Sequence, residues 1–153
     1  MTKTGSSTLL LSLGDRESRV RLTGEDGVSR EFVLALGLDA MTPGPFRRDP
    51  PTPLELEQAI MVVEDVLMPL AAHVPPHPLV ELHSPVPLAE ALGSHELSRE
   101  SIERLFGQLV AMVEGDPLAS AQLPRDRRFA AALLILREWM HHLDAGSVAL
   151  VDQ

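Results

Sequence analysis

The chain has 153 residues and a formal net charge of −9, from 22 acidic and 13 basic side chains. It contains no cysteine, which excludes disulfides, thiolate zinc sites and cysteine nucleophiles. Its length and its 44% of hydrophobic residues are sufficient to form one buried core, so we expect a single domain over residues 1–153.

The distribution of charge and apolar runs limits the partners. Residues 1–53 carry seven basic and seven acidic side chains, whereas residues 54–153 carry six arginines against fifteen acidic residues. Because phosphate contacts need clustered positive charge, an acidic body argues against nucleic acid as a partner. No apolar run reaches membrane-spanning length, and residues 9–13 are too short for a signal-peptide core. We therefore expect a cytoplasmic protein with no membrane partner.

Residues 1–37 predict a three-stranded antiparallel meander. Short apolar or alternating runs over 8–13, 18–23 and 28–36 are separated by glycine-containing turns. Val28, Phe32 and Leu34 are expected on one face of the third strand. Opposed residues of an antiparallel pair lie on the same face, and here this requires that their residue numbers sum to an even total. The connecting loop must then contain an odd number of residues, which predicts a three-residue loop over 25–27 with Gly27 left-handed.

A proline-rich crossover over residues 38–52 leads into a helical part over residues 53–146. Thr52, Pro53 and Glu55 form a capping-box pattern that starts a helix over 53–73, which Pro69 should bend or end. Ser98 begins a second helix over 98–114, and Gly115 follows it. Between them, residues 78–83 are a possible short strand and 84–92 a possible short helix closed by Gly93.

The segment 124–143 contains eight consecutive apolar residues, 129–136. A helix that is apolar all round is buried all round, so this one should be the central helix of the fold. Residues 147–151 could then pair with a sheet edge or fray. The expected class is α+β, with the meander packed on a layer of three main helices.

Histidines are the first set of candidate site residues. The standard catalytic motifs are absent, so no catalytic residue and no cofactor is predicted. His73, His77 and His83 fall within eleven residues, and His141 lies three residues after Glu138, a spacing that places both on one helix face. Imidazole clusters can bind zinc without cysteine. A structural role in a proline-rich loop and at a helix C-terminus is favoured over this metal site.

Arginines are the second set. Arg125, Arg127 and Arg128 lie in the first turn of the last helix, where they oppose its dipole. Together with exposed amides they could bind phosphate or carboxylate. The favoured alternative is pairing with acidic residues of neighbouring helices, namely Glu55, Glu57, Glu100 and Glu103.

The leading functional hypothesis is a non-enzymatic assembly, chaperone or adaptor-type protein that binds a protein partner or itself, as a homodimer. It depends on the acidic charge, the uncovered sheet edge and the missing catalytic motifs. One alternative is a small-ligand or metal-dependent enzyme that uses the histidine loop 73–83 and the end of the last helix. A further alternative is an anion-binding regulatory module at the three arginines.

Overall fold

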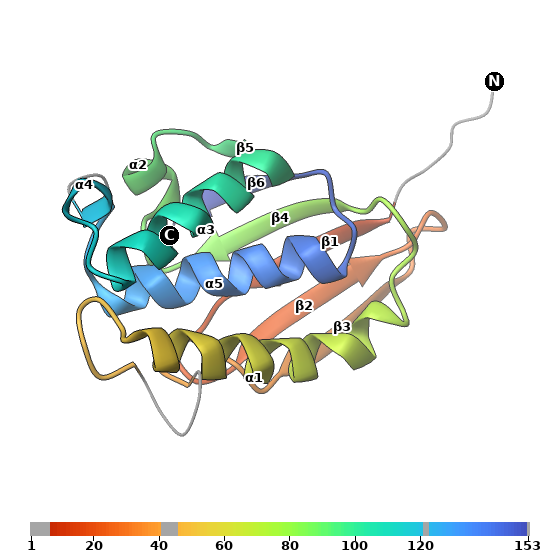
Figure 1. The fold of residues 1–153 in the computed structure, drawn as a ribbon. Helices are drawn as coiled ribbons and strands as arrows, with labels where there is room; N and C mark the ends of the chain where they lie inside the picture. Colours follow the sequence, from red (N-terminus) through yellow and green to blue (C-terminus); the bar gives the residue numbers. More distant parts are fainter. Residues whose placement is uncertain (1–6, 41–45, 121–122, 153) are drawn as a thin grey trace.

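The computed structural model describes residues 7–40, 46–120 and 123–152. A six-stranded mixed sheet is covered on one face by three helices that lie side by side (Figure 1). The predicted α+β class is confirmed. The strands are β1 (Thr8–Ser12), β2 (Ser18–Thr23), β3 (Ser29–Leu34), β4 (Leu79–Ser84), β5 (Glu96–Ser98) and β6 (Ser147–Asp152). The helices are α1 (Pro53–Ala71), α2 (Leu88–Leu92), α3 (Arg99–Val113), α4 (Pro117–Ser120) and α5 (Arg127–His142).

The predicted meander is one half of a larger sheet with the order β3-β2-β1-β4-β6-β5. The strand pairs β1–β2 and β2–β3 are antiparallel, as expected, but β1 also pairs with β4 in parallel. The two possible strands over 78–83 and 147–151 are both present, as β4 and β6. Strand β6 pairs in parallel with β4 and antiparallel with β5. Three neighbouring strands, β1, β4 and β6, therefore run in the same direction.

The turn between β2 and β3 has the predicted loop geometry. The backbone N–H of Gly24 donates to the carbonyl of Val28 at 3.0 Å, which encloses residues 25–27, and Gly27 has a φ of 83°. The third strand begins at Ser29, one residue later than predicted, and Val28 just before it is 61% exposed. This end of the edge strand has no helix over it.

Helix α5 is the buried centre of the helical layer, as predicted. Every residue from Phe129 to Leu136 is at most 1% exposed. It packs between α1 and α3 and over the inner face of the sheet. The helix begins at Arg127 rather than at residue 124, because Asp126 is its N-cap and accepts a hydrogen bond from the backbone of Arg128. None of the helices in the described ranges is long and apolar enough to cross a membrane.

Helix α1 begins with the predicted capping box. The backbone N–H of Thr52 donates to Glu55 Oε1 at 2.9 Å, and the backbone N–H of Glu55 donates to Thr52 Oγ1 at 3.2 Å. A third backbone N–H, from Arg47, donates to Glu55 Oε2 at 2.8 Å. Pro69 does not end the helix, which continues to Ala71.

We expect Glu55→Gln to make acid unfolding less steep. Burial raises the pKa of Glu55, but hydrogen bonds from the backbone of Thr52 and Arg47 outweigh it and lower the pKa below 4.5. A carboxyl with a lowered pKa stabilises the fold above its unfolded pKa, and this stability is lost as the pH falls through the folded pKa. The variant should cost about 0.5–1 kcal/mol at pH 7 and lose less stability than the wild type below the pKa of a free glutamate. Urea unfolding at a series of pH values measures this.

The matched control is Glu57→Gln, two residues further along the same helix. Glu57 is exposed and lies outside the capping box, so its replacement should leave the pH dependence unchanged. Equal slopes for all three proteins would contradict the assignment.

Candidate functional site

The carboxyl ends of β1, β4 and β6 lie at one edge of the sheet, because these strands are parallel neighbours. Ser12 pairs with His83, and His83 pairs with Val151, at this edge. In open sheets with parallel strands, ligands bind outside the carboxyl ends of the strands, where the chain connections diverge. Here β1 turns back into β2, whereas β4 leads towards α2. A ligand site in this fold is therefore expected at this carboxyl edge.

The turn that joins β1 to β2, residues 13–17, is tightly folded. The backbone N–H of Leu13 donates to the carbonyl of His83 at 2.9 Å, which extends the β1–β4 pairing by one residue. A Cβ at Gly14 would lie 2.3 Å from the carbonyl oxygen of Glu17, so only glycine fits there. Ser18, at the end of the turn, is buried, and its hydroxyl donates to the carbonyl of Leu36 at 3.0 Å. This hydrogen bond attaches the turn to the segment that follows β3.

Arg128, in the first turn of α5, joins this turn to the segment that follows β3. Its guanidinium donates to Asp15 at 2.7 Å and to Asp39 at 2.6 Å. The backbone N–H of Asp39 in turn donates to the carbonyl of Asp15 at 2.7 Å. The hydrogen bond to Asp15 raises the pKa of Arg128, burial opposes this, and Asp39 adds to the rise. The N-terminus of α5 is thus held against the carboxyl edge.

Arg127 forms a second contact of the same kind. Its backbone N–H donates to Asp49 Oδ1 at 2.7 Å, and its guanidinium lies 3.8 Å from Asp49 Oδ2. Arg125 is exposed to solvent just before the helix. The first turn of α5 therefore presents a helix N-terminus and arginine side chains, and a carboxylate already occupies this anion-binding position.

The acidic partners of these arginines differ from those that the sequence suggested. They are aspartates of loops near the carboxyl edge, Asp15, Asp39 and Asp49, rather than glutamates of the neighbouring helices. Sequence analysis missed these three aspartates as site residues. The only available signal was the Gly14-Asp15 turn, because Asp39 and Asp49 are distant in sequence from both the turn and α5.

The structure gives each candidate histidine a different environment. His73 stacks near Phe32 with ring centroids 5.7 Å apart, and His77 lies 3.8 Å from Asp144. His83 contacts Glu81 at 3.2 Å, on the sheet face opposite the helices. His141 contacts Arg99 at 3.3 Å. Across residues 7–40, 46–120 and 123–152, no group of three or more side chains is arranged to hold a metal ion.

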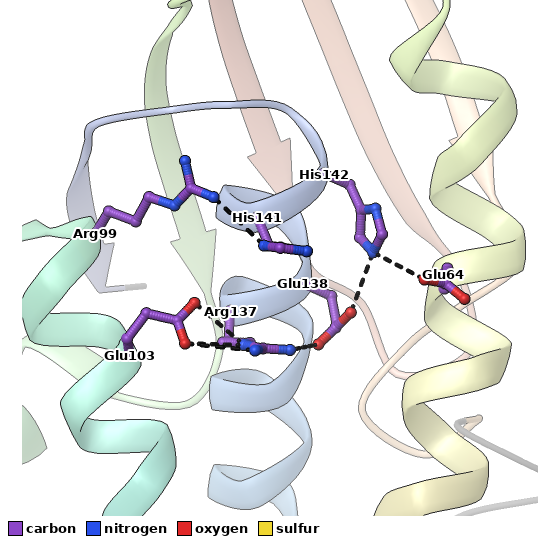
Figure 2. A network of polar contacts seen from close by, with 7 residues as sticks. All are labelled: Glu64, Arg99, Glu103, Arg137, Glu138, His141 and His142. Carbon is purple, nitrogen blue, oxygen red and sulfur yellow. Dashed lines mark hydrogen bonds and ion pairs between the residues drawn. The ribbon is translucent and has the colours of Figure 1, made fainter.

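The most buried charge lies elsewhere, on the helical layer. Glu138 is 1% exposed, and its carboxylate contacts Arg137 and, at 3.2 Å, His142 (Figure 2). His142 also lies 3.4 Å from Glu64 of α1, and Arg137 lies 3.3 Å from Glu103 of α3. Burial lowers the pKa of Arg137, but Glu138 and then Glu103 outweigh it, and the net pKa is raised. This network links α5 to α1 and α3, so we assign it a role in stability.

The fold was compared with known proteins. No protein-family model and no curated protein matches the sequence. Among solved structures, a PPX-GPPA enzyme of Aquifex aeolicus superposes with a TM-score of 0.68 at 14% identity, over 97% of this chain and 54% of that chain. An exopolyphosphatase from Cytophaga hutchinsonii gives a TM-score of 0.65 at 15% identity, over 96% of this chain and 53% of that chain. This chain therefore shares their fold and spans about half of their length.

These similarities correct the leading functional hypothesis. The similar structures named above are a PPX-GPPA enzyme and an exopolyphosphatase, which contradicts the expectation of a non-enzymatic adaptor and fits the enzyme alternative better. The sequence could not reveal this, because it carries no motif that identifies the fold.

We expect Glu138→Gln to destabilise the protein by about 1–3 kcal/mol, the range for losing a hydrogen bond to a charged group. The neutral amide provides no negative charge to pair with the guanidinium of Arg137, whose side chain is 24% exposed. Urea unfolding at pH 7 measures the change. Glu57→Gln is the exposed control and should change stability by less than about 0.5 kcal/mol. If both variants unfold alike, the network does not hold the helices together.

Proposed function

We propose that this chain binds phosphate groups at the carboxyl edge of its sheet, as part of an enzyme that hydrolyses phosphoanhydride bonds. The shared fold with Ppx/GppA enzymes supports an enzymatic role. An exopolyphosphatase and an exopolyphosphatase-like protein among the similar structures make inorganic polyphosphate the first substrate to test. The proposed reaction transfers a terminal phosphoryl group to water, which releases inorganic phosphate and a chain one unit shorter.

The observation that carries this proposal is the carboxylate of Asp49 at the N-terminus of α5. It accepts a hydrogen bond from the backbone of Arg127 and lies beside the guanidinium of the same residue. A carboxylate and a phosphate use the same features, namely exposed backbone N–H groups, the positive end of the helix dipole and a guanidinium. Asp49 therefore stands where a phosphate oxygen would bind.

Arg128 would contribute to the same site. Its two hydrogen bonds, to Asp15 and Asp39, show that its guanidinium can hold two anionic oxygens at once. A phosphate that displaces these aspartates would gain a bidentate contact and free two carboxylates beside it. Such carboxylates can orient an attacking water or hold a Mg²⁺ ion that the phosphates also bind.

A second candidate function is phosphate binding without hydrolysis. It is favoured by the same pairing, because both Asp15 and Asp39 accept hydrogen bonds from Arg128 and neither is available as a base until a ligand displaces it. The chain also spans only about half the length of the enzymes that share its fold. Binding and turnover must therefore be measured separately.

We expect Arg127→Gln to weaken polyphosphate binding about 10- to 100-fold, as for the loss of one charge-assisted hydrogen bond. Calorimetry with polyphosphate in a Mg²⁺ buffer measures binding, and release of inorganic phosphate measures hydrolysis. Arg104→Gln is the control, since Arg104 is an exposed arginine of α3 and the substitution makes the same change in net charge.

The outcomes separate the two candidates. Binding with phosphate release, both weakened by Arg127→Gln and not by Arg104→Gln, supports the hydrolase. Binding that responds to the variants in the same way but occurs without release supports the second candidate. Failure to bind, or equal weakening by both variants, rejects a phosphate site at α5.

A further inference from the structure

Helix α1 carries an apolar stripe on the side that faces away from the core. Leu54, Met61 and Met68 are 62%, 63% and 57% exposed, respectively. They are seven residues apart, so they lie on one helix face at intervals of about 10.5 Å. The buried residues of the same helix, which lie on the opposite face, are Leu56, Ala59, Val63, Leu67 and Leu70. The stripe adds nothing to the core of this chain.

The charged side chains of α1 itself all have one sign. Helix α1 contains four acidic residues and no lysine or arginine. Glu57 lies three residues after Leu54, and Asp65 lies four residues after Met61, so both border the stripe. Both side chains are exposed. A partner that covers the stripe therefore meets negative charge beside it.

Shallow apolar grooves run along both sides of α1. One groove of about 230 Å³ lies against β3 and includes Phe32, Val33 and Val66 in its lining. Another of about 190 Å³ lies against α3 and includes Ile60, Val110 and Val113. Apolar side chains of a helix docked on α1 could enter these grooves. The exposed methionines of α1 can adapt to varied partner side chains.

We propose that the outer face of α1 binds a basic amphipathic helix of a partner protein. Apolar side chains of that helix cover Leu54, Met61 and Met68, and its lysine or arginine side chains lie against Glu57 and Asp65. Charge favours this occupant over a second copy of the chain, because two α1 helices would bring the exposed Glu57 and Asp65 of one copy against those of the other. The proposal is independent of the phosphate site.

Two synthetic helical peptides test it. Both carry leucines in a stripe with seven-residue spacing; one has lysine and arginine at the flanking positions and the other has glutamate. Fluorescence anisotropy with labelled peptides should detect binding of the basic peptide only, weakened by salt. The double variant Met61→Gln/Met68→Gln, which keeps charge and helix propensity, should weaken binding at least tenfold. Glu57→Gln/Asp65→Asn should weaken it and reduce its salt dependence.

Leu118→Gln is the matched control, because Leu118 is 76% exposed on α4, outside the stripe. It should leave peptide binding unchanged, and circular dichroism should show the same helix content for all variants. Unchanged binding to the Met61→Gln/Met68→Gln variant, or equal binding of the acidic peptide, overturns the proposal. So does a dimer in native mass spectrometry that the same double variant dissociates, since the occupant would then be a second copy.

Discussion

The arrangement of the sheet and the other helices follows from the burial of α5. Eight successive apolar residues cannot face water on any side, so the helix must be enclosed by the sheet beneath it and by α1 and α3 beside it. Alanines in its first half allow close approach of these neighbours. Once α5 lies centrally, its N-terminus reaches the carboxyl edge of the sheet and its C-terminus meets both flanking helices. The positions of the proposed phosphate site and of the buried ionic network both follow.

The two ends of α5 use charge differently. At the N-terminus, arginines meet aspartates of loops that lie near the carboxyl edge, and these contacts are half-exposed. At the C-terminal end, Glu138 is enclosed, and its carboxylate forms an ion pair with Arg137 and contacts His142. A solvated ion pair can exchange an aspartate for a ligand at little cost, whereas a buried one cannot open without losing stability. The first arrangement suits binding and the second suits stability.

Helix α1 shows the same division between inner and outer faces. Its inner face completes the core, and its capping box fixes where it starts. Its outer face is apolar at every seventh position and acidic beside it, although nothing in the described chain covers it. Fold stability alone does not account for this pattern, since polar residues would serve equally well there.

The local elements could be predicted from sequence patterns alone. Periodicity located α1, α3 and α5 to within a few residues. The capping residues Thr52 and Ser98 indicated where α1 and α3 begin, and the apolar run at 129–136 identified the buried helix. These features depend on neighbours within one or two helical turns. The pairing of β1 with β4, and of β4 with β6, was decided only by the tertiary structure, because parallel strands are joined through long crossovers that leave no local signal. The carboxyl edge, with Asp15, Asp39 and Asp49 gathered around the start of α5, exists only once those strands are aligned.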